Sequence, residues 1–248
     1  MIVEATAVCN RGLVREMNQD AIYADHDGVV GIFVVADGMG GHSSGEVASS
    51  YMVKCIENWW LELNKEKLSL RAFDVIAELA EHIKESSSQL HNKFLDENIQ
   101  GGTTLVVLLV FEETYAVLSV GDSHAYIAQD KIMVQINQDD VWENLPENRN
   151  LSETEKKNDQ RYGKLTMAAV FDNPIEIKIT KGILKKNDMF VVCSDGGYKY
   201  CPSKNMNKYA AVRFENKSTE RILNDIQKEI IKNGAGDNYS VIVCKTKR

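Results

Sequence analysis

The sequence has few of the residues that mark disordered or fibrous proteins. Only 3 prolines and 16 glycines occur among 248 residues, and no repeat or low-complexity tract is present. The longest apolar run, Leu105 to Phe111, is far too short to span a membrane. With 44% hydrophobic residues the chain can bury a sizeable core, and its length predicts a single domain over residues 1–248.

An excess of basic residues is also absent. The 29 lysines and arginines are outnumbered by 36 aspartates and glutamates, which gives a formal net charge of -7. Because a general nucleic-acid binder needs a basic face to pair with phosphates, we expect no nucleic-acid partner. The acidic balance does not exclude phosphate chemistry, since a metal ion can supply positive charge locally.

The five cysteines are odd in number, are scattered and form no CxxC pair. Cys9, Cys193 and Cys244 lie in apolar, strand-like stretches, which predicts buried, reduced thiols in a cytoplasmic protein. The first residues, MIVEATAVCNRG, lack the basic segment and long apolar run of a signal peptide, which agrees with that location.

Apolar patterns predict a chain of strands interrupted by long helices. Strands are expected at residues 2–9, 20–25, 31–36, 103–111, 114–120, 124–129, 132–136, 174–180, 188–194 and 239–244. Two helices between the third and fourth strands would bury faces that carry Ala48, Met52, Cys55 and Trp59, and Phe73, Ile76, Ala80, Ile83, Leu90 and Phe94. A further helix is expected near residues 218–232.

These elements predict an α+β layered fold. Each helix has one apolar face that must pack on a sheet, and two sheets face to face with helices outside would bury every such face. Ser43 and Glu46 can form a capping box at a helix start, and Asp130-Lys131 can form a tight hairpin turn. Residues at about 138–166 are polar and irregular, which predicts a functional flap or a mobile segment.

Five aspartates stand at the ends of predicted buried strands: Asp20, Asp37, Asp122, Asp195 and Asp237. A strand end holds a side chain rigidly, and the glycines beside several of them allow close approach of a ligand. Carboxylates that converge on one spot repel one another, and a hard divalent cation such as magnesium, manganese or calcium removes that conflict. A single such aspartate is more often a turn residue or helix cap, so the metal interpretation depends on all five.

Six short segments occur in order along the chain: VRxxNQD (Val14 to Asp20), VVADGMGGH (Val34 to His42), GGTT (Gly101 to Thr104), VGDS (Val120 to Ser123), CSDG (Cys193 to Gly196) and GDNYSVIV (Gly236 to Val243). Together they resemble the bacterial branch of the PPM-type, or type 2C, protein phosphatases, from about residue 4 to 245. The DGMGGH and GDN segments are highly specific. The resemblance implies a four-layer α-β-β-α sandwich, in which two antiparallel sheets are flanked by antiparallel helices.

The resemblance also implies a two-metal site. Asp37 would bridge two metal ions, and the Gly38 carbonyl would bind one of them. Asp195 and Asp237 would complete the pair, while Asp20 would hold coordinated water.

Two more residues have implied roles. Asp122 resembles the aspartate of a third, weaker metal site, and Arg15 resembles the arginine that binds the substrate phosphate with its planar fork of donors. The implied function is a protein serine/threonine phosphatase with two or three divalent cations, manganese or magnesium. It would hydrolyse phosphoserine and phosphothreonine by attack of a water that bridges two metals. We expect a monomer whose partners are phosphorylated substrates of a serine/threonine kinase, with no membrane partner.

The chain departs from the family pattern near the expected third metal and the flap. His124 replaces an arginine, Asn137 to Asp140 replace a segment with a histidine, and Gly197-Tyr198 follow SDG. These changes bear on substrate choice more than on hydrolysis. Two other functions stay open: a pseudophosphatase scaffold, which usually lacks core aspartates that this chain keeps, and a hydrolase of small phosphate esters. A cysteine phosphatase is disfavoured because CSDGGYKYC has no arginine and no phosphate-cradling loop.

Overall fold

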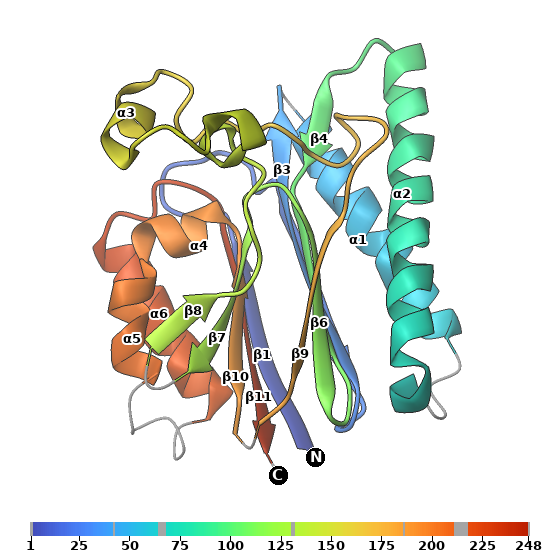
Figure 1. The fold of residues 1–248 in the computed structure, drawn as a ribbon, viewed down its shortest axis with the longest axis vertical. Helices are drawn as coiled ribbons and strands as arrows, with labels where there is room; N and C mark the ends of the chain where they lie inside the picture. Colours follow the sequence, from blue (N-terminus) through green and yellow to red (C-terminus); the bar gives the residue numbers. More distant parts are fainter. Residues whose placement is uncertain are drawn as a thin grey trace.

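Two antiparallel sheets lie face to face in the computed structural model, and helices cover the outer face of each (Figure 1). The structure describes residues 2–41, 43–63, 68–129, 132–185, 187–210 and 218–247. The predicted α+β sandwich is therefore present. No helix among these residues is long and apolar enough to cross a membrane.

Both sheets are antiparallel throughout. The first has the order β1 (Ile2–Asn10), β11 (Tyr239–Lys247), β10 (Met189–Cys193), β7 (His124–Gln129) and β8 (Ile132–Gln135). The second has the order β2 (Asp20–His26), β3 (Gly31–Gly40), β5 (Leu105–Val110), β6 (Thr114–Val120) and β9 (Lys178–Ile183), and β4 (Gly101–Thr103) pairs with β3. The predicted turn at Asp130-Lys131 lies outside the described residues, although Gln129 pairs with Ile132 beside it.

The helices divide between the two outer faces (Figure 1). The second sheet is covered by α1 (Ser44–Glu62) and α2 (Ala72–Asp96), with a short 3-10 turn, η1 (Leu68–Arg71), before α2. The first sheet is covered by α4 (Asp195–Tyr200), α5 (Ser203–Ala210) and α6 (Thr219–Lys232). The sequence predicted α1, α2 and α6 but not α4 and α5, because six or eight residues are too few to establish a helical apolar period.

Strand β3 shows why the predicted apolar run is continuous. Ile32 and Val34 pack under α1 and α2, whereas Phe33 and Val35 pack against the other sheet. Both faces of this strand are therefore buried. Since neither face meets water, apolar residues occupy consecutive positions and do not alternate with polar ones. Three apolar layers result, one between the sheets and one under each set of helices.

The buried face of α1 differs from the predicted one. Met52, Ile56 and Trp60 are fully buried, whereas Cys55 and Trp59 are only half-buried. Apolar residues occur at helical spacing on both neighbouring faces, so the sequence pattern could not separate them. The packing of α1 against β2 and β3 selects the face that carries Trp60.

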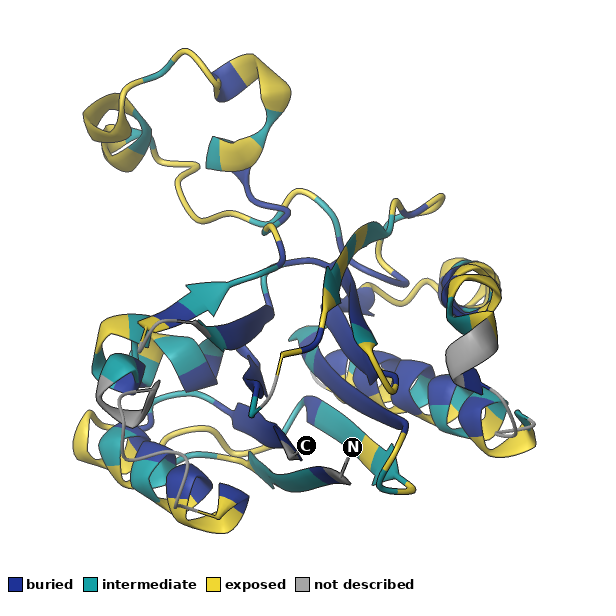
Figure 2. Cartoon of the chain, turned by 60° about the horizontal axis from the view of Figure 1, so that its bottom comes forward, coloured by how far each residue is buried: buried dark blue, intermediate teal, exposed yellow. Residues whose placement is uncertain are grey.

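Residues 138–166 form an extension that stands out from the sandwich and is mostly exposed (Figure 2). The extension contains η2 (Trp142–Asn144), η3 (Pro146–Asn148) and α3 (Glu153–Asn158), regular structure that the sequence did not predict. Its base is anchored: Asp140 and Lys178 form an ion pair of 2.5 Å, and the Arg161 guanidinium lies 4.4 Å from the ring centre of buried Trp142.

Replacing Trp60 should destabilise the layer under α1. The Trp60 Nε1 donates a hydrogen bond of 2.7 Å to Asp25, and the side chain is fully buried. We expect Trp60→Phe to lower the free energy of unfolding by roughly 2–4 kcal/mol, because it removes a charge-assisted hydrogen bond and leaves a cavity. Half-buried Trp59 is the matched control, and Trp59→Phe should cost less than about 1 kcal/mol. Equal losses in equilibrium denaturation would contradict this assignment of the buried face.

Candidate metal and active site

The sheet topology brings the five aspartates to one end of the sandwich, the upper end in Figure 1. Asp20 begins β2 and pairs directly with Asp37 near the end of β3. Asp195 follows β10, and Asp237 precedes β11, the antiparallel neighbour of β10. Asp122 follows β6, which runs parallel to β3 because both pair with β5 in antiparallel fashion.

Asp20 is the most buried of these carboxylates, with 7% of its surface exposed. Its Oδ2 accepts a hydrogen bond of 2.7 Å from Ser194, whereas its buried Oδ1 has no hydrogen-bond partner among the described residues. Burial raises the pKa of Asp20 to about 7, and the charges of Asp195 and Asp237 act in the same direction. An unpaired buried carboxylate oxygen of this kind suits a cation or its bound water.

Asp37 lies where the negative charge is most concentrated. Burial, followed by the charges of Asp20 and Asp195, raises the pKa of Asp37 well above its usual range. The backbone around it is held by Thr104 of the GGTT segment, whose N–H donates to the Asp37 carbonyl at 2.9 Å. The Thr104 hydroxyl accepts a bond of 3.1 Å from the Asp37 N–H. The GGTT segment therefore fixes the strand end that carries Asp37.

Only glycine fits at position 38. A Cβ atom there would collide with the backbone oxygens of Gly45 and Gln19. The Gly38 N–H donates to the Gln19 carbonyl at 3.0 Å, so the start of α1 and the segment before β2 both close on this residue. Gly38 therefore lies buried in the backbone wall next to Asp37.

Arg15 reaches the same cluster from the loop before β2. Its Nη2 donates to Asp237 Oδ2 at 2.8 Å, and its Nε lies 2.7 Å from Oδ1 of the same carboxylate. This bond raises the pKa of Arg15, and the charges of Asp195 and Asp37 add to the effect. The guanidinium is thus arranged as a bidentate fork on a planar anion, the geometry that also suits a phosphate.

A second cation pairs with the cluster. Lys199 Nζ donates to Asp195 Oδ2 at 2.6 Å. In the described part of the chain, no three His, Cys, Asp or Glu side chains are already arranged to hold a metal ion. The donor set itself fits a hard divalent cation, since it consists of several oxygens from buried, mutually repelling carboxylates.

A chain of contacts that the sequence did not predict connects Asp122 to the extension. The Tyr198 hydroxyl donates to Asp122 Oδ2 at 3.4 Å, and the Tyr198 ring stacks on His124 with ring centres 3.6 Å apart. His124 Nε2 lies 3.0 Å from Asp139 Oδ2, at the base of the extension. His124 and Tyr198 both differ from the residues that the family resemblance leads us to expect, and these two differences are in direct contact. Burial raises the pKa of Asp122, and the charge of Asp195 adds to this.

Asn238 is a further residue whose role the sequence did not reveal. Its Nδ2 donates to the carbonyls of Arg11 and Met17, both at 2.8 Å, and its Oδ1 accepts from the Gln19 N–H at 2.9 Å. These bonds clamp the two ends of the loop that carries Arg15. The asparagine of the GDN segment was the available signal, but only the folded chain shows what it binds.

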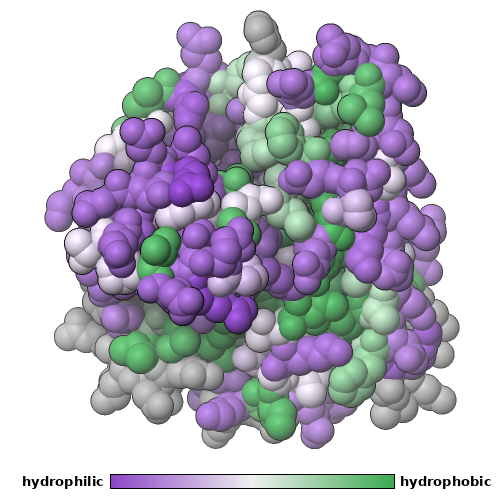
Figure 3. All heavy atoms as spheres, turned by 45° about the horizontal axis from the view of Figure 1, so that its top comes forward, coloured by the Kyte–Doolittle hydropathy of each residue, from purple (hydrophilic) through white to green (hydrophobic). Residues whose placement is uncertain are grey.

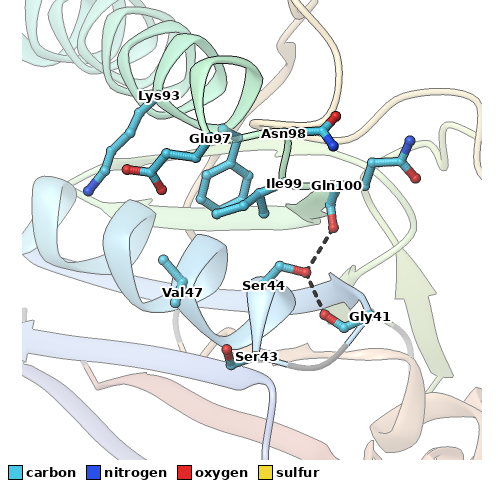
Figure 4. Close-up of a pocket in the computed structure, with 10 residues that line it drawn as sticks. Gly41, Ser43, Ser44, Val47, Lys93, Glu97, Asn98, Ile99 and Gln100 are labelled. Carbon is cyan, nitrogen blue, oxygen red and sulfur yellow. Dashed lines mark hydrogen bonds between the residues drawn. The ribbon is translucent and has the colours of Figure 1, made fainter.

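The face around the cluster is mainly hydrophilic, with smaller apolar areas between the polar side chains (Figure 3). A hollow of about 720 Å³ lies between the start of α1 and the end of α2, and none of the five aspartates lines it (Figure 4). Ser44 in this hollow donates to the carbonyls of Gly41 and Gln100, both at 2.8 Å. Ser43 is the N-cap of α1 but makes no side-chain capping bond, so the predicted capping box with Glu46 is wrong.

Residues 14–233 match the family described as Protein phosphatase 2C. The chain is 28% identical over 200 residues to the serine/threonine protein phosphatase PstP of Mycobacterium tuberculosis, covering 79% of this chain and 36% of that one. It therefore spans little more than a third of the length of this relative. It is also 28% identical over 207 residues to the serine/threonine phosphatase stp of Listeria monocytogenes, with 79% of each chain covered.

A solved structure agrees with the sequence match. The catalytic domain of the serine threonine protein phosphatase PstP, in complex with two manganese ions, has a TM-score of 0.79 and 23% identity. The match covers 100% of this chain and 99% of that one, and it confirms the predicted fold class. The family profile matches all but short stretches at the two ends and contains five of the six predicted segments in their expected order, whereas the GDNYSVIV segment lies just beyond the match. The chain therefore belongs to the protein phosphatase 2C family.

Proposed function

We propose that this chain is a metal-dependent phosphatase of phosphoserine and phosphothreonine in proteins. The single observation that supports this most is the cluster of buried, mutually repelling carboxylates at one end of the sandwich, with an arginine fork beside it. Family membership adds support, because both relatives described above carry the name of a serine/threonine phosphatase. The basic test is hydrolysis of phosphoserine and phosphothreonine peptides with manganese and with a chelator.

In this proposal two divalent cations, manganese or magnesium, are held by the carboxylates. Asp37, the Gly38 carbonyl, Asp195 and Asp237 would hold the ions, with Asp37 as the ligand that both ions share, and Asp20 would hold coordinated water. When bound, the ions would lower the pKa of a water molecule, so that it can lose a proton and attack phosphorus. They would also supply positive charge for the phosphoryl oxygens. Ser194 holds Asp20 in place through its bond to Oδ2, and the buried Oδ1 has no hydrogen-bond partner among the described residues.

Arg15 binds the phosphate of the substrate in this proposal. Its side chain is 55% exposed, so a phosphoprotein can reach it from solvent. The loop clamped by Asn238 positions the guanidinium, and Asp237 orients its fork. Arg15 would then exchange all or part of its contact with Asp237 for the phosphate oxygens.

The thiol alternative has no support in the structure. Cys193 and Cys201 are fully buried, and burial raises the pKa of Cys193 far from the range of a thiolate nucleophile. All five cysteines are free, and Cys193 and Cys244 are buried as predicted, whereas Cys9, which was also predicted to be buried, is only half-buried. Their free state suits the cytoplasm, which we retain as the proposed location. A scaffold without activity is disfavoured by the intact carboxylate cluster.

Phosphoproteins are the proposed substrates, with a serine/threonine kinase acting on the same targets. We further propose that residues 1–248 act as a single, monomeric catalytic domain, and that the extension at 138–166 is a flap that contacts the substrate protein. The contacts from Asp139 to Asp122 support this, because they connect the base of the flap with the cluster. The alternative function, hydrolysis of small phosphate esters, is distinguished from phosphoprotein hydrolysis by comparing turnover of phosphopeptides with that of a small phosphomonoester.

Removing the charge of Asp37 should nearly abolish turnover. We expect Asp37→Asn to lose almost all phosphopeptide hydrolysis while its circular dichroism spectrum stays unchanged. The substitution removes the charge of the proposed shared metal ligand but keeps the size of the side chain. Asp96→Asn, at an exposed position on α2, is the matched control and should keep full activity. Full activity of Asp37→Asn, or activity that survives exhaustive chelation, would refute the two-metal proposal.

Arg15 should act mainly on substrate binding. We expect Arg15→Ala to raise KM for a phosphopeptide by the equivalent of roughly 1.5–3 kcal/mol, the value of a charge-assisted hydrogen bond. Arg71→Ala removes another exposed arginine that pairs with a carboxylate, far from the cluster on η1, and should leave KM unchanged. If Arg15→Ala has the KM and kcat of the wild type, Arg15 does not belong to the site.

Asp122 should hold a third, weaker ion. We expect crystals soaked in high manganese to show an ion in direct contact with Asp122 in the wild type but not in Asp122→Ala, and both to keep the core pair. Asp122→Ala should lower turnover of protein substrates more than it lowers metal affinity at the core pair. A wild-type crystal with no ion at Asp122 would remove the third site and leave only the pair.

A further inference from the structure

Lys199 lies on the short helix that begins at a proposed metal ligand. Helix α4 starts at Asp195, and Lys199 follows four residues later, so both side chains lie on one face of the helix. The Lys199 Nζ reaches Asp195 Oδ2 at 2.6 Å. The lysine side chain is 56% exposed and that of Asp195 only 20%, so the ammonium covers the carboxylate from the solvent side.

The charge of Lys199 acts on more than one carboxylate. Burial lowers the pKa of Lys199, but the bond to Asp195 and the charges of Asp195, Asp122 and Asp37 outweigh this and raise the pKa overall. Lys199 is therefore a second cation beside the cluster, after Arg15, and its ammonium lies directly against Asp195. It supplies part of the positive charge that a divalent ion would supply.

Other lysines on helices form pairs of the same length with a different setting. Lys84 lies 2.7 Å from Glu81 on α2, and Lys54 lies 2.8 Å from Glu57 on α1. Glu81 is exposed and Glu57 is half-buried, and neither belongs to the group of five aspartates. In contrast, the partner of Lys199 is a carboxylate that the proposed function requires as a metal ligand, so the lysine and the metal ion compete for the same carboxylate.

We propose that Lys199 is a built-in counter-cation of the metal site: it neutralises Asp195 in the metal-free protein and leaves that carboxylate when a divalent cation binds. This inference rests on the proposed function, because it assigns Asp195 to the metal. Lys199 thereby weakens metal binding and stabilises the metal-free fold. Arg15 neutralises Asp237 in a similar way, but its proposed contact with phosphate makes it unsuitable for separating the two effects.

The electrostatic consequences have definite signs. Without the ammonium, the carboxylates of the metal-free site repel one another with less compensation, so the metal-free fold loses stability. The incoming ion no longer competes with a fixed cation for Asp195, so its affinity rises. Both changes follow from one charge, and a lysine that merely stabilised a helix would produce the first change but not the second.

The test is calorimetric titration of chelator-treated protein with manganese, together with thermal unfolding in EDTA. We expect Lys199→Met to lower the Kd for manganese about twofold to fivefold, the range of an exposed ion pair, and to lower the Tm in EDTA. Lys199→Arg keeps the charge and should restore both values toward those of the wild type. Lys84→Met removes a comparable helix pair outside the site and should leave the Kd unchanged.

The outcomes separate the inference from the proposed function. If the wild type binds no manganese, the proposed function itself fails. If the wild type binds manganese and Lys199→Met binds it with the same Kd, Lys199 and Asp195 form an ordinary ion pair within a helix, and the counter-cation inference is overturned. A higher Kd in Lys199→Met would overturn it too, because the lysine would then be holding Asp195 in the geometry that the metal needs.

Discussion

The mutual repulsion of buried carboxylates is the constraint around which this structure is arranged. Asp20 and Asp37 face each other across two paired strands, where burial and neighbouring charges oppose their ionisation. A fold that only minimised its free energy would avoid this arrangement, since isolated buried charges are costly. Arg15 and Lys199 offset part of this cost by pairing with Asp237 and Asp195, and the remaining negative charge is the basis of the proposed metal site.

Carboxylates that repel one another stay close together only if the surrounding backbone forms a rigid frame. The frame is a set of strands buried on both faces, of which β3 is the clearest case, because its side chains alternate between two apolar layers. Backbone contacts complete it: Gly38 closes against Gly45 and Gln19, and Asn238 ties the loop of Arg15 to the start of β11.

The departures from the family pattern have a shared physical setting. His124 and Tyr198 stack on each other, and they join Asp122 to Asp139 at the base of the extension. A change in this stack can act on Asp122, the proposed ligand of a third ion, and on the extension together. Substrate preference in this chain is therefore expected to depend on coupled residues, which a position-by-position comparison with relatives would treat as separate differences.

The sequence by itself determined the class of fold, the family and the identity of the clustered aspartates, because strand ends, apolar runs and short glycine-rich segments are local features. It did not determine which face of α1 is buried, since Trp59 and Trp60 both lie at helical spacing and only packing on the sheet decides between them. It also did not reveal Lys199 as a partner of Asp195, because α4 is too short to show a helical period. Contacts such as the stack of His124 on Tyr198 join segments more than 70 residues apart, and only the tertiary structure decides them, since distance along the chain carries no information on distance in space.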